Sequence, residues 1–299
     1  MTICHKDTSV DDLIAARTRY AKLIRKTAQL RSERLVRALS EVPREDFMGS
    51  GPWKTMRFTF PLQYHDTPDA NPVHLYDDVL IALDPARGLN NGLPSGLARW
   101  IDALDIIEGD HVVHAGCGTG YYTAIVAHIV GSKGRVTAIE YDDDLAARAR
   151  SSLRNFHNVE VIAGDASTYD PGPADAIFVN AGATHPLPLW LDNLKPSGRL
   201  VFPMVRWPEG AKFGVANAGW GVMLRIQSLR SGYGARLLGP AGFYPCFGAI
   251  DAEADRLLGD AFAANVLTEV RSLRREPHDV DSSCLLHGKG YCFSRIEAS

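Results

Sequence analysis

The sequence predicts an α/β protein with a doubly wound, mostly parallel, seven-stranded sheet. Two observations support this. From Leu97 to the low 200s, short runs rich in β-branched and aromatic residues alternate with amphipathic helical segments, a pattern typical of a parallel sheet with helices on both faces. A glycine-rich turn, Gly116 to Gly120, follows the first of these runs and precedes a helix. Ligands of such sheets bind beyond the carboxyl ends of the strands.

The N-terminal part is predicted to be helical from Ser9 to Ser40, because leucine, isoleucine and tyrosine recur there at helical spacing. Ser9 and Asp12 form a capping-box pattern, Ser32 is placed to cap a second helix, and Pro43 ends it. Residues 49–94 are rich in Gly, Pro, Asp and aromatic side chains. We consider two interpretations of this stretch, a lid or substrate wall and a packed structural arm.

The central part predicts strands and helices in alternation up to a final parallel strand, RLVFPM. Two further strand-like runs, GVMLRIQSL and ARLLGPAGFYPCF, are separated by the turn SGYG and predict an antiparallel hairpin that closes one edge of the sheet. Residues 251–299 predict one amphipathic helix and a polar tail. The predicted organisation is therefore an N-terminal helical and lid region (1–93), a ligand-binding domain (94–250) and a C-terminal extension (251–299).

Composition limits the function. The chain has 299 residues, 45% of them hydrophobic, with a formal net charge of −3. These values give no cationic surface for a phosphate backbone, so we expect no nucleic-acid partner. The first residues contain no apolar segment of targeting or membrane-spanning type, and we expect a cytoplasmic protein that does not bind membranes. The five cysteines are scattered and odd in number, which favours reduced thiols. A homodimer is a further hypothesis.

Three strand ends carry residues suited to an adenosine-type ligand. Gly116, Gly118 and Gly120 allow the backbone to approach a ligand closely. Glu140, at the end of the second strand, is placed to accept hydrogen bonds from two ribose hydroxyls. Asp165, after the third strand, can accept from an exocyclic adenine amine, and the Ala166 amide can donate to a ring nitrogen. Three neighbouring residues are also expected to contact the ligand: Cys117, Tyr121 and Tyr141.

The spacing of the glycines selects among adenosine-containing ligands. A dinucleotide fingerprint would place a small residue at position 121, where this chain has tyrosine. The sequence also contains no G-x-x-x-x-G-K-[ST] motif for a triphosphate. S-adenosylmethionine remains, because it has no phosphates and needs only a bare turn beside its aminocarboxypropyl arm.

The stretch from about Glu33 to Pro203 resembles the protein-L-isoaspartate O-methyltransferase family. The similar segments are RLVRALSEVPREDF, HAGCGTGYYTA, GDAS and DAIFVNAGA. The resemblance implies a Rossmann-like class I methyltransferase fold and S-adenosylmethionine as the cofactor. Two departures bear on function. Gly92 and Leu93 stand before Pro94 where the family usually has serine and glutamine in the acceptor site, and His114 replaces the acid that helps hold the methionine amine. Asp77, Asp78 or Asp84 could supply that acid instead.

The candidate catalytic residues are Asn90, Asn91, Asn180 and His185. A carboxylate acceptor needs orientation by neutral donors and no base, which suits the three asparagines. A hydroxyl or nitrogen acceptor would need a base, for which His185 is the candidate. We therefore favour carboxyl O-methylation of a peptide or small acid over ordinary isoaspartyl repair. The alternatives are O- or N-methylation of a small metabolite, and a catalytically silent S-adenosylmethionine-binding partner protein.

A cysteine and histidine cluster near the C-terminus could bind zinc in principle. It consists of Cys284, His287 and Cys292, with His278 nearby. The spacing C-x2-H-x4-C is compact and has no second paired cluster. The sequence is therefore interpreted as lacking a metal site, with these cysteines as buried thiols of a terminal strand.

Overall fold

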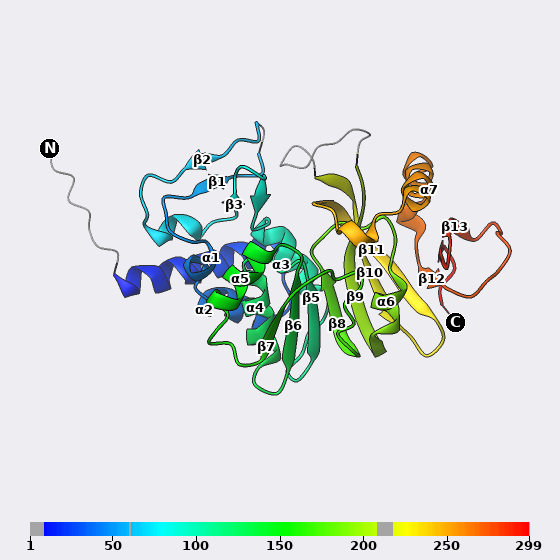
Figure 1. The fold of residues 1–299 in the computed structure, drawn as a ribbon, viewed down its shortest axis with the longest axis horizontal. Helices are drawn as coiled ribbons and strands as arrows, with labels where there is room; N and C mark the ends of the chain where they lie inside the picture. The colour runs from blue at the N-terminus through cyan, green and yellow to red at the C-terminus, as the bar shows by residue number, and fades with distance from the viewer. Residues whose placement is uncertain (1–8, 60, 208–217, 299) are drawn as a thin grey trace. The chain divides into compact units, whose positions relative to one another are not determined.

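The structure is a computed structural model that describes residues 9–59, 61–207 and 218–298. The chain forms two compact units, residues 1–102 and residues 103–299 (Figure 1). The predicted division at residues 93 and 250 remains a prediction. Each unit has its own sheet, and the two are described in turn.

The described residues of the first unit form three α-helices, α1 (Val10–Ala28), α2 (Glu33–Glu41) and α3 (Pro94–Asp102), and α1 packs against the other two. The predicted N-terminal caps are confirmed. The Ser9 side chain accepts from the Asp12 amide in a complete capping box, and the Ser32 side chain accepts from the Leu35 amide. Both caps satisfy amides that the first turn leaves without helical partners, so these local signals determine where the helices begin.

Residues between α2 and α3 form a four-stranded sheet of order β2-β1-β3-β4. Its strands are β1 (Lys54–Met56), β2 (His65–Asp66), β3 (Leu80–Asp84) and β4 (Leu89–Asn90), with 3-10 turns η1 (Arg44–Phe47) and η2 (Pro72–Leu75). The buried Arg44 guanidinium donates to the carbonyl oxygens of Leu75, Asp77 and Val79 and lies over the Tyr20 ring. This buried cation, whose two terminal nitrogens are both hydrogen-bonded, ties the stretch to α1.

The second unit is built on a ten-stranded sheet of order β13-β14-β12-β11-β10-β9-β8-β5-β6-β7. The strands are β5 (His111–Ala115), β6 (Arg135–Glu140), β7 (Val159–Ala163), β8 (Ala174–Val179), β9 (Leu194–Arg206), β10 (Gly219–Ser228), β11 (Tyr233–Phe243), β12 (Ser272–Arg274), β13 (Cys284–Gly288) and β14 (Tyr291–Ser294). Strands β7, β6, β5, β8 and β9 are parallel, and the others pair antiparallel. The predicted doubly wound fold is confirmed, with the seven expected strands running from β7 to β11.

Where the structure describes this unit, it has four α-helices, α4 (Tyr121–Val130), α5 (Asp143–Ser152), α6 (Pro188–Asp192) and α7 (Ala252–Ala263). Figure 1 shows α4 and α5 beside strands β5 to β7. Helix α4 is buried along nearly its whole length, which matches its almost entirely apolar sequence. Helices α6 and α7 contact β9.

The C-terminal extension differs from the expected polar tail. The hairpin β10–β11 does not close the sheet, because β12 pairs with β11 and β14 pairs with both β12 and β13. Leu286, Tyr291 and Phe293 are buried on this added hairpin. Its strands are short, and their few apolar positions are interspersed with polar residues, so the sequence signal for them is weak.

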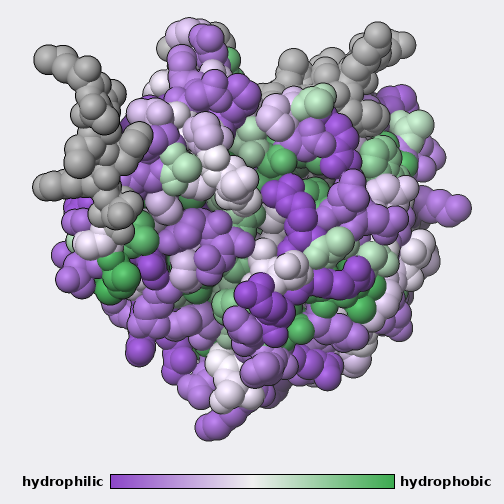
Figure 2. All heavy atoms as spheres, turned by 60° about the vertical axis from the view of Figure 1, so that its left-hand side comes forward, coloured by the Kyte–Doolittle hydropathy of each residue, from purple (hydrophilic) through white to green (hydrophobic). Residues whose placement is uncertain are grey.

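No helix within the described residues is long and apolar enough to cross a membrane. Figure 2 shows a face on which hydrophilic residues predominate, with smaller groups of apolar residues between them.

Candidate cofactor-binding site at the carboxyl ends of the parallel strands

The strand order reverses between β5 and β8, which are neighbours in the sheet but not in the chain. Ala115 at the end of β5 pairs in register with Ile139 of β6 and with Val179 of β8. The residues that follow these strands therefore gather at one edge of the sheet. This is the switch point at which ligands bind in open α/β sheets.

The glycine turn after β5 has a backbone that other residues rarely adopt. Gly116, Gly118 and Gly120 have φ values of 74°, 58° and 97°. A Cβ atom on Gly116 would lie 3.1 Å from the carbonyl oxygen of Asn180, and one on Gly120 would lie 2.7 Å from the Leu153 side chain. Gly120 is the N-cap of α4. The three glycines are thus required by conformation, and two of them also by close packing.

Glu140 holds the turn from the end of β6. One carboxylate oxygen, Oε2, accepts from the Gly118 amide at 2.6 Å, and Oε1 accepts from the Asp142 amide at 3.1 Å. The side chain is buried, and this burial raises the carboxyl pKa, while the two amides act in the opposite direction. A carboxylate can accept more than these two bonds. Acceptance from ribose hydroxyls remains a prediction.

Asn180 lies against the first glycine from the end of β8. The backbone N–H of Asn180 donates to the Ala115 carbonyl at 2.7 Å, and its side-chain Nδ2 donates to the Gly116 carbonyl at 3.4 Å. The Oδ1 atom is buried and has no hydrogen-bond partner among the described residues. The Thr119 hydroxyl in the same turn is also buried, and no described residue forms a hydrogen bond with it. Buried polar atoms are normally satisfied, so this edge holds acceptors available to a donor such as an ammonium group.

Asp165 and Ala166 follow β7 at the same edge. The Asp165 Oδ1 atom accepts from the Ser167 amide at 2.8 Å, and the Ala166 carbonyl accepts from the Trp190 indole at 2.9 Å. A Cβ on Gly248 would lie 2.9 Å from the Asp165 Oδ2 atom, so a segment from beyond β11 approaches this acid closely.

That segment brings in a residue that sequence reasoning missed. Gly182 and residues 244–246 exchange backbone hydrogen bonds, Gly182 N to Tyr244 O and Cys246 N to Gly182 O. The Phe247 ring then lies 5.3 Å from the Tyr141 ring, centroid to centroid, and both side chains are more than half exposed. Two exposed aromatic rings beside a strand end are suited to stacking on a base. The only signal in the sequence is an aromatic residue next to a glycine, which is weak.

The remaining cofactor candidates are largely internal. The side chains of Cys117 and Tyr121 are buried, and burial raises the pKa of the Cys117 thiol. Contact of either residue with a ligand remains a prediction.

His114 cannot take the role of the acid that the sequence resemblance places there. It is fully buried, stacks on Phe178 and shares a 2.9 Å hydrogen bond between its Nδ1 and the Thr123 hydroxyl. Burial lowers its pKa to about 3, so the ring is neutral near pH 7.

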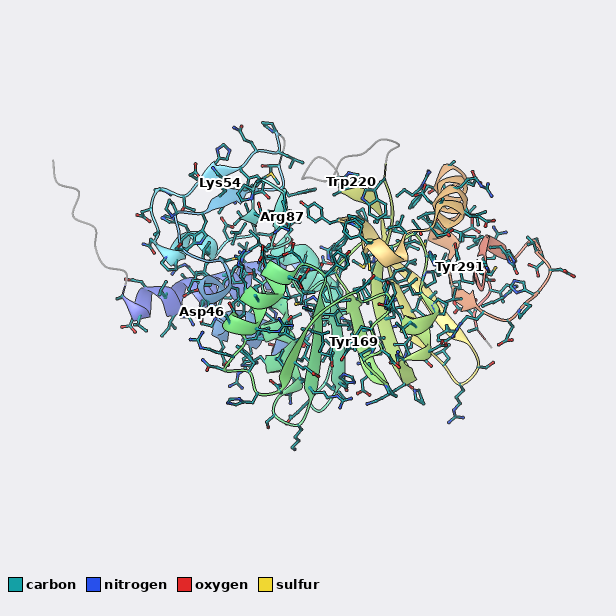
Figure 3. All side chains as sticks on the ribbon, viewed as in Figure 1. Asp46, Lys54, Arg87, Tyr169, Trp220 and Tyr291 are labelled. Atoms are coloured by element: carbon teal, nitrogen blue, oxygen red, sulfur yellow. The ribbon has the colours of Figure 1, made fainter. Side chains whose placement is uncertain are left out.

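The three acids that could substitute all belong to the first unit and have partners there. Asp84 pairs with Arg87 and Asp77 pairs with Arg57, whereas Asp78 accepts from the Ser95 amide. Arg87 is labelled in Figure 3. Asp77 and Asp84 are thus paired with cations, whereas Asp78 accepts an amide hydrogen bond at one of its oxygens.

Asn90 and Asn91 also lie in the first unit, at the end of β4. The Asn90 side-chain oxygen accepts from the Gly92 amide at 2.8 Å. Asn91 is buried, and its backbone N–H donates to the Ile81 carbonyl. Its side-chain Nδ2 has no hydrogen-bond partner among the described residues. Gly92 has φ +77°, and a Cβ there would lie 2.8 Å from the Leu97 Cδ2 atom.

His185, in the second unit, is held on two sides. Its Nδ1 lies 3.0 Å from the Thr184 hydroxyl, and its ring stacks on Tyr291 with centroids 5.8 Å apart. Burial lowers its pKa, and the nearby Asp251 carboxylate partly offsets this effect. Asp251 is the N-cap of α7, and its amide donates to the same Thr184 hydroxyl. The sequence showed no acid near His185, because the fold brings this one from a distant segment.

The sheet order, the three left-handed glycines and the acid at the next strand end define a class I methyltransferase type of α/β protein. A family model described as protein-L-isoaspartate(D-aspartate) O-methyltransferase matches residues 18–212. "Protein-L-isoaspartate O-methyltransferase 2" of Archaeoglobus fulgidus is 34% identical over 230 residues, covering 73% of this chain and 94% of the relative.

Solved structures show the same fold. A structure described as a protein-L-isoaspartate O-methyltransferase has a TM-score of 0.59 at 20% identity and covers 83% of this chain and 69% of that one. A Plasmodium falciparum structure described as this type of enzyme, in complex with S-adenosyl-L-homocysteine, has a TM-score of 0.58 at 15% identity and covers 77% and 97%.

The chain therefore belongs to the protein-L-isoaspartate(D-aspartate) O-methyltransferase family. It is a methyltransferase that depends on S-adenosylmethionine.

Proposed function

We propose that the protein transfers a methyl group from S-adenosylmethionine to a carboxylate of a peptide or small acid other than an ordinary isoaspartyl repair site. One observation carries the proposal. At the place of the family's acceptor-site serine stands Gly92, which has no hydroxyl and whose left-handed backbone and close Leu97 neighbour disfavour a serine. The loop therefore lacks the donor that the resemblance associates with isoaspartyl substrates.

The residues at the sheet edge suit the cofactor's parts. S-adenosylmethionine supplies an activated methyl group on a sulfonium. Glu140 would accept from the ribose hydroxyls, and Tyr141 with Phe247 would stack on the adenine. The buried Asn180 Oδ1 atom, which has no other partner among the described residues, would accept from the ammonium of the methionine arm. In this assignment, the neutral Asn180 oxygen takes over the contact with the ammonium that the family's acid makes and that the neutral His114 does not supply.

The acceptor side needs orientation and no base. A carboxylate is already anionic near neutral pH, so positioning and exclusion of water can supply much of the acceleration. The Asn91 Nδ2 donor, which has no hydrogen-bond partner in the part of the chain that the structure describes, would suit one carboxylate oxygen, because an amide donates a hydrogen bond without titrating.

One observation favours a second candidate, O- or N-methylation of a small metabolite with His185 as base. The lowered pKa of His185 keeps its imidazole neutral near pH 7, and Asp251 is close enough to stabilise the protonated ring. A neutral imidazole beside an acid is able to accept a proton.

Isoaspartyl test peptides probe the proposal directly. The purified protein and a repair enzyme of the family, as positive control, are incubated with methyl-labelled S-adenosylmethionine and an isoaspartyl peptide. We expect transfer at least a hundredfold slower than in the control, while the protein binds the cofactor in calorimetry. Transfer at a rate comparable with the repair enzyme would overturn the substrate proposal.

The His185→Gln variant separates the two candidates once an acceptor is identified. A carboxylate acceptor predicts little loss of turnover and a flat pH profile between roughly pH 6 and 8.5. A hydroxyl or amine acceptor predicts a loss on the order of a hundredfold or more, with a wild-type rate that rises through the histidine pKa.

A further inference from the structure

Four side chains near the C-terminus bring their metal-binding atoms together, outside the methyltransferase site. They are His278, Cys284, His287 and Cys292, and one ligand atom from each lies within 4.8 Å of all the others. Both cysteines are free thiols. Cysteine and histidine are the ligand types that zinc prefers, and two of each is a common structural set.

The strand register explains how the cluster forms. His287 of β13 pairs directly with Cys292 of β14, so their side chains lie on the same face of the hairpin. In a regular strand Cys284 would point to the opposite face from His287, because they are three positions apart. A register irregularity between Cys284 and Leu286 changes this alternation. His278 enters from the loop that precedes β13.

The contacts of His278 match a metal-bound arrangement, and His287 has a ring nitrogen available to a metal. The His278 Nδ1 lies 2.8 Å from the Glu276 carbonyl, and its Nε2 lies 3.6 Å from the Cys284 sulfur. Tetrahedral zinc with ordinary Zn–S and Zn–N bonds separates a sulfur and a nitrogen ligand by about 3.6 Å. Zinc-bound histidines usually donate their other ring N–H to a carbonyl or carboxylate. The His287 Nδ1 is buried without a hydrogen-bond partner among the described residues.

We propose that these four residues bind one zinc ion in a structural Cys2His2 site. Each thiol releases its proton to solvent on binding, and two thiolates neutralise the divalent cation. Four protein ligands fill a tetrahedral shell, which leaves no open position for a substrate or reactive water. The site is therefore structural, in contrast to the sequence-based expectation of buried thiols without metal.

The position of the cluster indicates which part of the fold the metal would stabilise. It would fasten the loop before β13 to the β13–β14 hairpin, which forms the last two strands of the sheet. The hairpin packs against α7 and carries Tyr291, labelled in Figure 3, whose ring stacks on His185. Zinc binding would thus stabilise the surroundings of His185 without touching the cofactor residues. The inference is independent of which acceptor is methylated.

Metal analysis of the intact protein tests the proposal. The protein is purified under reducing conditions without a histidine tag, and its zinc is measured by elemental mass spectrometry per chain. We expect about one zinc per wild-type chain. Cys284→Ser and His287→Ala should lose most of it, whereas Cys246→Ser and His157→Ala, which alter residues outside the cluster, should retain it. Retention of full zinc by both cluster variants would overturn the proposal.

Cobalt substitution of the wild-type chain decides the matter even if the cluster variants fail to fold. Tetrahedral Co2+ with thiolate ligands gives intense visible ligand-field bands and a near-ultraviolet charge-transfer band, and zinc should abolish both. We also expect a chelator to lower the melting temperature and added zinc to restore it. Absence of the cobalt bands, or an intact mass showing a Cys284–Cys292 disulfide in the natively purified chain, would contradict the proposal.

Discussion

Single residues decide what the two binding regions can do. Asn180 is the clearest case, because its side-chain amide contacts the glycine turn while its oxygen is buried and has no hydrogen-bond partner in the described part of the chain. His114, one strand away, is neutral and already bonded to Thr123. Under the proposed function, the ammonium of the cofactor's methionine arm would therefore bind an amide oxygen instead of a carboxylate.

Asn180→Ala tests this assignment with two ligands. We expect affinity for S-adenosylhomocysteine to fall about tenfold or more, because a hydrogen bond to a charged group contributes roughly 1.5–3 kcal/mol. Affinity for methylthioadenosine, which lacks the amino-acid arm, should be nearly unchanged. Calorimetry with both ligands measures this, and an equal loss for the two would show that Asn180 acts on the nucleoside or on the turn as a whole.

Gly92→Ser tests whether the backbone and the Leu97 side chain disfavour a serine at this position. We expect it to lower stability by about 1–3 kcal/mol, since it combines a left-handed backbone with a Cβ that approaches Leu97 at 2.8 Å. Gly172→Ser is the matched control, because Gly172 has φ +70° but no atom within 4 Å of such a Cβ. Thermal unfolding compares them, and we expect neither variant to methylate isoaspartyl peptides. A Gly92→Ser protein as stable as the control, or active on those peptides, would refute the steric explanation.

At the scale of elements, the candidate cofactor site combines the carboxyl ends of the parallel strands with the segment after β11, which returns to the same edge of the sheet. The family model ends at residue 212, so Phe247 is contributed by a part of the chain that this model does not match. Its ring completes an aromatic pair with Tyr141, which directly follows β6.

Phe247→Ala should weaken S-adenosylhomocysteine and methylthioadenosine equally, by roughly three- to tenfold, because stacking on a base is worth about 0.5–1.5 kcal/mol beyond area burial. Phe58→Ala is the control, since Phe58 is a similarly exposed phenylalanine in the other unit. Titration of both ligands against both variants gives the comparison. Unchanged affinity in Phe247→Ala would remove the ring from the site.

Local signals explain what the sequence predicted well. The capping serines, the glycine turn and the alternation from β5 to β9 depend on neighbouring residues, and the structure contains them all. The Tyr141–Phe247 pair and the Asp251–His185 proximity depend on segments far apart in the chain, for which a single sequence carries no signal. The sequence predicted a terminal strand around Cys284 and Cys292, where the structure has β13 and β14. It did not predict β12 or the pairing of these strands with β11, because the strands are short and their polar and apolar residues alternate only weakly.

At the scale of the whole molecule, the buried His114 makes the free energy of unfolding depend on pH. The folded-state pKa of His114 is lowered to about 3, below the roughly 6.5 of an unfolded chain. The unfolded state therefore binds an extra proton as the pH falls below 6.5, and stability is lost progressively between about pH 6.5 and 3. Above pH 6.5 the contribution is fully present.

His114→Asn should reduce this acid sensitivity. Between pH 7 and pH 5 we expect the wild type to lose about 2 kcal/mol more unfolding free energy than the variant, because one pKa unit corresponds to about 1.4 kcal/mol. Urea unfolding at the two pH values measures the difference, and the other titrating groups are shared by both proteins. Equal losses would mean that His114 is protonated in the folded state or exposed to solvent.

For the whole enzyme we propose a carboxyl methyltransferase with an acceptor other than ordinary isoaspartate. The most direct test is to incubate the protein with methyl-labelled S-adenosylmethionine and host extract and then expose the labelled product to mild alkali. A carboxyl methyl ester hydrolyses under these conditions, so we expect the label to be released as volatile methanol, and mass analysis of the product to place the methyl on a carboxylate. A label that stays bound through alkali, as an ether or methylamine would, contradicts the account and favours the metabolite O- or N-methyltransferase.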